Sequence, residues 1–410
     1  MGEITGIKSI IMNNSISSAL IITAVIFMDL LTGMEFDLFV PSLPMLQNQF
    51  NVSVTWVEAL VSINFIGYCL SVLFVGALSD RYGRKIVILS GLIIFIIGSA
   101  LCLWGMSYPA LFIGRLLQGI GIASPSILSF LIIADAYASL KRQQYFMAML
   151  NGVMNVAVAV SPIIGSFITL YFHWQGNFIA LLLLSFITLI VTIIFIPTQK
   201  PPAVIEKTSA LREYLSLFQF KPLMLLMINL TFVSIPYWIF VGISPVLYMK
   251  DLGVSLAHFG FYQGILALGF AIGSVLFAFM IHAVKSKSML NIASYLYIIG
   301  FTSMLVVTFI NHDNALMITG AFFLFVISQI IPSNLLTPIC FNFMPAQKGK
   351  IAATLRSAQC IFSSLGMQIA GYYYEGSFQN TGLIVSFCIG IAVITHFFVC
   401  RDKTLMRNEG

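Results

Sequence analysis

Residues Ile16 to Val40, ISSALIITAVIFMDLLTGMEFDLFV, form an apolar run that is long enough to cross a lipid bilayer as a helix. The run nevertheless contains three acids: Asp29 near its centre, and Glu35 and Asp37 toward its end. A carboxylate in hydrocarbon costs several kcal/mol unless it is protonated, paired or in contact with water. We therefore expect this helix to line an aqueous pathway, with at least one carboxyl group carrying a proton.

The composition of the chain is that of a membrane protein. Of its residues, 59% are apolar and 8% are charged, against about 25% charged in ordinary soluble domains. Apolar runs predict twelve membrane helices, at about 16–41, 54–77, 86–106, 109–133, 145–171, 177–197, 223–249, 257–283, 289–310, 315–343, 351–374 and 380–400. This all-α pattern predicts an N-terminal six-helix bundle (1–197), a cytoplasmic linker (198–222) and a C-terminal six-helix bundle with a short cytoplasmic tail (223–410).

Basic residues are concentrated in every second connection between the predicted spans. They follow spans two, four, six, eight and ten and recur after span twelve, whereas the other connections carry only Lys250. Because cytoplasmic loops retain Lys and Arg, both termini are expected in the cytoplasm. The net charge of +6 is thereby explained by topology.

The sequence favours a transporter over an enzyme. It has no Walker-type glycine loop, no histidine and acid cluster with metal-ligand spacing, and no nucleophile beside a base. Its six cysteines all fall in or beside apolar runs and are expected to be buried. We therefore expect no metal and no cofactor, and the lack of a long charged segment argues against a nucleic-acid partner.

A short turn between the second and third spans has the sequence GALSDRYGRK at residues 76–85. Its acid can cap a helix N-terminus or pair with an arginine, and its bases can reach Asp135 on the next loop. The spacing resembles the signature GxLaDrxGrkxxl of the major facilitator superfamily at nearly every position. The resemblance implies the two-bundle fold of that family and a gate formed, together with Asp135, by Gly76, Asp80, Arg81, Gly83 and Arg84.

Arg115 begins a second motif, RLLQGIGIA at residues 115–123, which is similar to the RxxqGxgaA signature of proton-linked drug antiporters in that superfamily. We interpret Arg115 as the only base deep in a predicted span. Its charge there needs a carboxylate partner or a water-filled cavity. At about 1.5 Å per residue, Arg115 and Asp37 lie about 9 Å and 6 Å inside their helix ends, at compatible depth. On an ideal helix Asp29 and Asp37 project about 80° apart and can share one cavity, whereas Glu35 points about 160° from Asp37 and is expected either to face another helix or to extend outward to the membrane surface.

The end of the first span, DLFVPSLP at residues 37–44, resembles the same region of the bicyclomycin and chloramphenicol resistance (Bcr/CflA) subfamily. Two membrane acids eight residues apart, as Asp29 and Asp37 are, are also similar to those of a related multidrug/proton antiporter. The resemblance implies proton coupling at Asp37 and Asp29, modulated by Arg115.

The fifth span contains SPIIGS at residues 161–166, where antiporters of this superfamily usually have gPxxGG. Pro162 and Gly165 predict a bend and close helix contact. Ser161 and Ser166 depart from the antiporter pattern, so the inference of export is weaker than that of proton coupling.

A substrate cavity is expected among aromatic and amide side chains of other spans. Tyr237 and Trp238 lie near mid-membrane, where they can stack on a flat substrate or else pack against a neighbouring helix. Asn64, Asn155 and Gln359 are candidates to touch the substrate, although most such amides form interhelical hydrogen bonds.

These features predict a proton-driven efflux antiporter for small hydrophobic or cationic compounds. It would act as a monomer by alternating access, with a small-molecule substrate, protons and the lipid bilayer as its partners. A proton-coupled importer of a metabolite or siderophore-like compound has the same fold and is favoured by residues 161–166. A transporter-like receptor or chaperone would bind a ligand without moving it. The direction of flow in oriented vesicles separates import from export.

Overall fold

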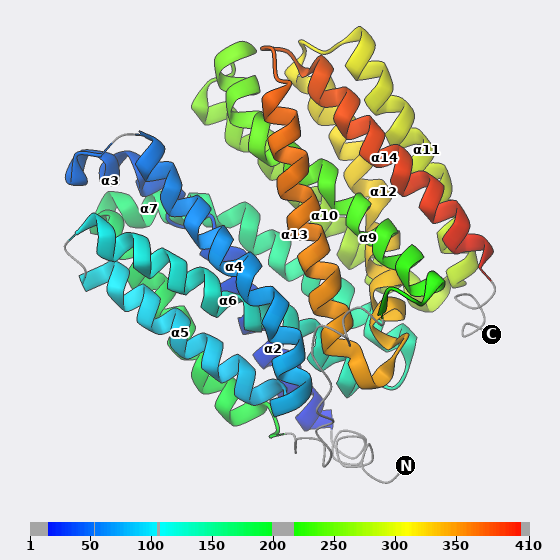
Figure 1. Ribbon diagram of the computed structural model, residues 1–410, viewed down its shortest axis with the longest axis horizontal. Helices are drawn as coiled ribbons and strands as arrows, with labels where there is room; N and C mark the ends of the chain where they lie inside the picture. Colours follow the sequence, from blue (N-terminus) through cyan, green and yellow to red (C-terminus); the bar gives the residue numbers. More distant parts are fainter. Residues whose placement is uncertain (1–14, 53, 105–106, 199–216, 403–410) are drawn as a thin grey trace. The chain divides into compact units, whose positions relative to one another are not determined.

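Helices make up almost the whole of the computed structural model, which describes residues 15–52, 54–104, 107–198 and 217–402 (Figure 1). Within these ranges there is no strand. Long apolar runs form helices here because hydrocarbon offers no partner for backbone N–H and C=O groups, and a helix satisfies them internally.

The chain folds into two compact units. Unit 1 comprises Met1–Ser139, Val153–Lys207 and Met344–Ala353, and unit 2 comprises Leu140–Gly152, Thr208–Phe343 and Thr354–Gly410. The elements before residue 200 are α2 (Ser15–Glu35), η1 (Val40–Ser42), α3 (Leu43–Phe50), α4 (Val54–Tyr82), α5 (Arg84–Trp104), α6 (Tyr108–Ala136) and α7 (Leu140–Phe195). Those after it are α9 (Lys221–Ser244), η2 (Pro245–Asp251), α10 (Leu256–Ala283), α11 (Ser286–Ile310), α12 (Ala315–Asn342), η3 (Pro345–Gln347), α13 (Lys348–Tyr372) and α14 (Phe378–Arg401).

Two helices contribute to both units. The first residues of α7, up to Gly152, belong to unit 2, and the first residues of α13, up to Ala353, belong to unit 1. The predicted division into bundles at residues 198–222 stays a prediction, since residues 199–216 lie outside the described part of the chain.

Each predicted span coincides with a helix or, in α7, with part of one. In the described residues, nine helices are long and apolar enough to cross a membrane, or ten if the bent α4 is one span. The long α7 holds two predicted spans and has a break at His173, where φ is 55°. α13 lies outside the count because Arg356, two glutamines and several serines make it more polar than the others.

Glycines let α6 lie close to its neighbours in unit 1. A Cβ atom on Gly119 would lie 1.9 Å from the carbonyl oxygen of Asn64 on α4. On the α5 side, a Cβ on Gly121 would lie 2.5 Å from the backbone nitrogen of Phe95. The glycines of the RLLQGIGIA motif therefore bring α6 into backbone contact with α4 and α5, and the side chains of this motif lie between the helices.

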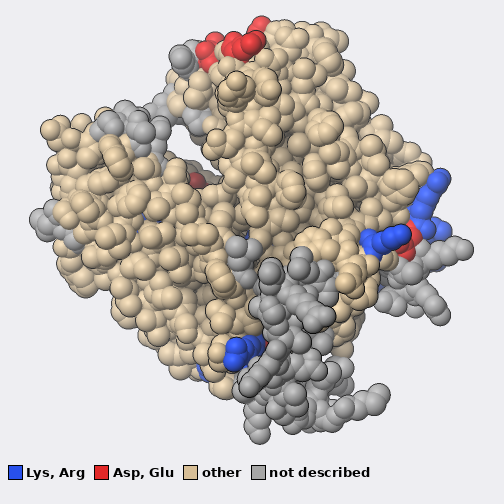
Figure 2. All heavy atoms as spheres, viewed as in Figure 1, with Lys and Arg blue, Asp and Glu red and all other residues tan. Residues whose placement is uncertain are grey.

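The described part of the face seen in Figure 2 is mostly uncharged. In this view, acidic side chains gather over the end of unit 2 where α13 leads into α14, and basic ones lie mainly near the end of α14. Large apolar side chains such as Phe261 and Phe387 are exposed. So much apolar surface suits contact with lipid.

Candidate functional site

A fully buried ion pair joins α2 and α6 inside unit 1. The Nη1 atom of Arg115 donates to Oε1 of Glu35, the last residue of α2, at 3.1 Å. The Nδ2 atom of Asn64 on α4 donates to the same carboxylate oxygen at 2.6 Å. Three helices thus meet at one carboxylate, which balances the charge of the buried guanidinium at the cost of desolvating both groups.

Neighbouring groups hold the Arg115 side chain in position. Its Nη1 also donates to Oε1 of Gln118 at 2.8 Å, and the Gln118 amide in turn donates to Ser99 Oγ on α5 at 2.8 Å. On the other side, the Phe39 ring lies 4.0 Å from the guanidinium carbon, in cation–π contact. Gln118 is the glutamine of the RLLQGIGIA motif, and sequence reasoning assigned it no role.

The structure corrects the expected partner of Arg115, which is Glu35 and not Asp37. The angular argument assumed an ideal helix from Asp29 to Asp37, but α2 ends at Glu35 and Asp37 lies in the turn that follows. The expectation that Glu35 faces another helix is confirmed by its bonds to α4 and α6.

The other two acids of the first span differ in their exposure. Asp29 is fully buried within α2. Asp37 is partly exposed, and the structure gives its carboxylate no hydrogen bond to the described residues. One acid therefore lies deep in the span, one forms the ion pair, and one is accessible at the end of the helix.

The GALSDRYGRK turn forms a second charged cluster in unit 1. Arg84 Nη1 lies 2.6 Å from Asp80 Oδ1, and its Nε donates to Asp135 Oδ2 at 3.1 Å. Lys348 Nζ lies 3.2 Å from the other oxygen of Asp135. Gly83 has a φ of 90°, a left-handed conformation that glycine adopts without strain, and it allows α4 to end directly before α5.

Asp80 also caps the N-terminus of α13. Its two carboxylate oxygens accept hydrogen bonds from the backbone N–H groups of Gly349 at 3.1 Å and Lys350 at 3.0 Å. A Cβ on Gly76 would lie 2.1 Å from the carbonyl oxygen of Gly349, so this glycine permits the close approach. Arg81 is exposed and lies over the Tyr82 ring, outside this cluster.

The packing motif of the fifth span has a close contact at its glycine. A Cβ on Gly165 of α7 would lie 1.9 Å from the carbonyl oxygen of Leu38, in the turn that carries Asp37. Pro162, one turn earlier, is exposed. Gly165 therefore lies directly beside the segment that follows α2.

The candidate cavity residues come from both units: Asn64 and Asn155 from unit 1, and Tyr237, Trp238 and Gln359 from unit 2. Asn64 is fully buried in the ion-pair cluster, and Gln359 Nε2 donates to the Leu230 carbonyl of α9 at 3.0 Å, so both make interhelical hydrogen bonds. Asn155 is partly buried on α7. On α9, Trp238 is 36% exposed and its ring centroid lies 5.9 Å from that of Tyr237.

A base in α13 was missed by the sequence analysis. Arg356 lies eight residues after Lys348, well inside a helix, so Arg115 is not the only base deep in a predicted span. The glutamines and serines around Arg356 weaken the apolar signal of this span, but the position of Arg356 five residues after the predicted start of the span at residue 351 is visible in the sequence.

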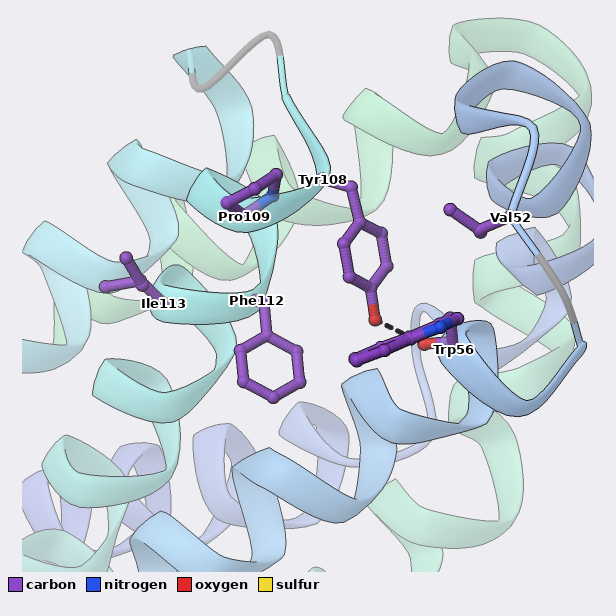
Figure 3. A pocket seen from close by; sticks show the side chains of 6 residues that line it. All are labelled: Val52, Trp56, Tyr108, Pro109, Phe112 and Ile113. Atoms are coloured by element: carbon purple, nitrogen blue, oxygen red, sulfur yellow. Dashed lines mark hydrogen bonds between the residues drawn. The ribbon is translucent and has the colours of Figure 1, made fainter.

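An apolar recess of about 440 Å³ lies near the start of α4 and α6 (Figure 3). Trp56 and Tyr108 lie on one side of it, and the Tyr108 hydroxyl donates to the Trp56 carbonyl oxygen. Its lining residues are Val52, Trp56, Tyr108, Pro109, Phe112 and Ile113. None of these is charged, so the recess suits an apolar group.

Long apolar helices, a buried ion pair and a charged turn between two helices define a multi-pass membrane transporter. The sequence profile of the Major Facilitator Superfamily matches residues 25–367, and the chain belongs to this family, as its motifs predicted. Proteins of this family carry small molecules across membranes and are not enzymes.

Two bacterial relatives are similar in sequence. Multidrug resistance protein MdtL of Klebsiella pneumoniae subsp. pneumoniae is 25% identical over 236 residues, which are 57% of this chain and 59% of the relative. Chloramphenicol resistance protein CraA of Acinetobacter baumannii is 26% identical over 272 residues, which are 65% and 66% of the two chains. The matched segment thus spans about three fifths of the length of the first relative.

Two solved structures share the fold. The human organic anion transporter MFSD10 has a TM-score of 0.71 at 19% identity, covering 93% of this chain and 99% of its own. The fucose:proton symporter FucP of E. coli has a TM-score of 0.73 at 14% identity, covering 94% and 98%. At these identities the likeness concerns the fold alone.

Proposed function

We propose that this protein is a proton-coupled antiporter that expels small hydrophobic compounds across a bacterial inner membrane, with both termini in the cytoplasm. One observation carries the proposal: a single membrane helix and the turn after it hold Asp29, Glu35 and Asp37, and one of these acids is paired with a buried arginine. The names of the relatives, which refer to multidrug and chloramphenicol resistance, support export of drug-like compounds.

The three acids have different roles in this proposal. A proton on Glu35 would leave the guanidinium of Arg115 buried without a counter-charge, which costs about 3–5 kcal/mol in comparable buried pairs. We therefore assign proton exchange to Asp37 and Asp29 and a positioning role to Glu35. Asp37, which is partly exposed, receives the proton, and Asp29 lies deeper along the same helix.

The charged turn acts as the gate. Asp80 binds the N-terminus of α13 while Arg84 joins it to Asp135, so one acid connects α4, α5 and α13. Alternating access requires these bonds to break and re-form in each cycle, because they fix the start of α13 beside the end of α4.

Substrate-dependent proton flux in proteoliposomes tests the coupling. With chloramphenicol as the probe, the unchanged protein is expected to move protons when substrate is added, and the double variant Asp29→Asn and Asp37→Asn is expected to lose that flux. Asp313→Asn is the control, since it makes the same change of acid to amide at an exposed position outside both clusters. Unchanged flux in the double variant would rule out the assignment of these acids.

The direction of transport is tested in vesicles of known orientation. An exporter accumulates chloramphenicol in inside-out vesicles that have an acidic lumen. An importer accumulates its substrate in right-side-out vesicles under an inward proton gradient. The second result would favour the alternative that the serines at 161 and 166 suggest.

A further inference from the structure

Arg356 is a guanidinium inside a membrane helix of unit 2 that the proposed function does not use. It lies eight residues after the start of α13, or about 12 Å along the helix axis. A charge at such a depth is costly in lipid, and membrane proteins direct such side chains to a partner or to a water-filled interior.

The helical position of Arg356 directs it away from lipid. Residues three, four and seven positions apart share a helix face, and Cys360 and Ser363 on the face of Arg356 are both buried. The opposite face carries exposed apolar side chains, among them Leu365 and Ile369. Arg356 is therefore on the protein-facing side of α13, and its side chain remains only partly buried there.

Among the described acids of unit 2, none lies inside a membrane helix where it could balance this charge. The described acids of unit 2 lie at or beyond helix ends, and they are Asp251, Asp313, Glu375 and Asp402. In the described residues, Arg356 has one hydrogen bond, from its Nη1 to Oε1 of Gln359 at 3.3 Å. A guanidinium has five N–H donors, so most of its donors are available to a ligand.

Two hydrogen bonds orient the side-chain amide of Gln359 beside this guanidinium. Its Nε2 donates to the carbonyl oxygen of Leu230 on α9, which leaves Oε1 directed to Arg356. Ser363, one turn further along the same face, is fully buried, and its Oγ has no hydrogen-bond partner in the described part of the chain. Arg356, Gln359 and Ser363 thus form a polar stripe along one face of α13.

We propose that this stripe binds the carboxylate of an amphiphilic substrate, with Arg356 as its counter-charge. The planar fork of a guanidinium matches the two oxygens of a carboxylate, and such charge-assisted bonds are about twice as strong as neutral ones. The inference rests on the proposed transport function and specifies a substrate class for it: flat or apolar molecules that carry one carboxylate.

Binding of a matched pair of probes to the purified full-length protein tests the inference without transport. The probes are 2-naphthoate and 2-naphthamide, which share a ring system and differ in charge. The unchanged protein is expected to bind the carboxylate more tightly. Arg356→Gln is expected to weaken carboxylate binding about 10- to 100-fold and to change amide binding less than about threefold, since a hydrogen bond to a charged group is worth about 1.5–3 kcal/mol. Arg401→Gln, the same charge change at the end of α14, is the control.

A second variant keeps the guanidinium in place. Gln359→Glu gives Arg356 an acid three residues away, and it is expected to abolish the preference for the carboxylate while the protein stays folded. Equal binding of both probes by the unchanged protein would overturn the inference, as would a carboxylate preference that survives in both variants. Proton flux on addition of 2-naphthoate is measured separately in proteoliposomes, so a preference for the carboxylate without flux refutes the proposed proton coupling and not this site.

Discussion

Burial makes Arg115 and Glu35 depend on each other. Both side chains have no exposed surface, and the pair is bonded at 3.1 Å. Glu35→Gln is expected to destabilise the protein by about 3–5 kcal/mol, because the guanidinium then stays buried without a counter-charge. The measurement is thermal or denaturant unfolding in detergent.

The double variant Glu35→Gln and Arg115→Gln is the control for this prediction. It removes both charges, so it is expected to be more stable than Glu35→Gln alone, since uncharged partners at a buried pair are often tolerated. If Glu35→Gln were as stable as the unchanged protein, Arg115 would have a different counter-charge.

At the scale of single residues, the sequence predicts which charged residues need a partner inside the membrane but not which residue that partner is. That Arg115 needs a carboxylate follows from its depth in an apolar run. The choice of Glu35 over Asp37 depends on where α2 ends, and helix ends are the least certain feature of a pattern. Asn64 was selected for its polarity alone, which does not distinguish a substrate contact from the bond that it makes to Glu35.

The closeness of α4 and α6 depends on Gly119. Gly119→Ala places a methyl group 1.9 Å from the Asn64 carbonyl oxygen, so the two helices must move apart. We expect a loss of about 1–3 kcal/mol in stability, typical of overpacking, together with weaker transport because Arg115 lies one turn away on the same helix.

The matched control for Gly119→Ala is Gly320→Ala on α12. No atom lies within 4 Å of a Cβ added at Gly320, so only helix propensity changes there, and a gain of up to about 1 kcal/mol is expected. Equal effects at the two glycines, measured by thermal unfolding, would show that close helix contact is not what Gly119 provides.

The start of α13 depends on its cap. Asp80→Ala removes the acceptor of the Gly349 and Lys350 amides, and losing such a cap costs about 0.5–2 kcal/mol. Hydrogen exchange at these two amides is therefore expected to accelerate about 2- to 30-fold. Arg81→Ala, in the same turn but exposed, is expected to leave the exchange unchanged.

Elements were predicted best where the apolar signal is continuous. α5 and α6 coincide with predicted spans within a few residues. The break of α7 at His173 separates two spans that the sequence also separates, but its positive φ occurs at a residue that is neither glycine nor proline, so the residue type does not predict it. The aspartate of the charged turn was expected to cap a helix or pair with an arginine, and it does both.

At the scale of the whole molecule, α7 and α13 each contribute residues to both units. Asn151, near the start of α7, donates to Asn334 on α12 at 2.7 Å, and both residues belong to unit 2. The sequence does not predict this, because the contact joins residues 183 positions apart and neither neighbourhood has a motif. The membrane class and family follow from composition and motifs, whereas the membership of each helix in a unit follows only from three-dimensional contacts.

The membrane topology gives a prediction for the whole chain. α11 has 25 residues and is about 37 Å long, so its two ends reach opposite sides of a bilayer. Lys285 precedes it and Asp313 follows it, and both are exposed. Since basic connections stay in the cytoplasm, Lys285→Cys is expected to react with an impermeant maleimide only in inside-out vesicles, and Asp313→Cys only in right-side-out vesicles. The parent protein measures the background from the six native cysteines, each of which is buried or only partly exposed. Labelling of both positions from the same side would mean that α11 does not span the membrane, and labelling from the reversed sides would place the basic connections outside, in conflict with the charge distribution from which the orientation is inferred.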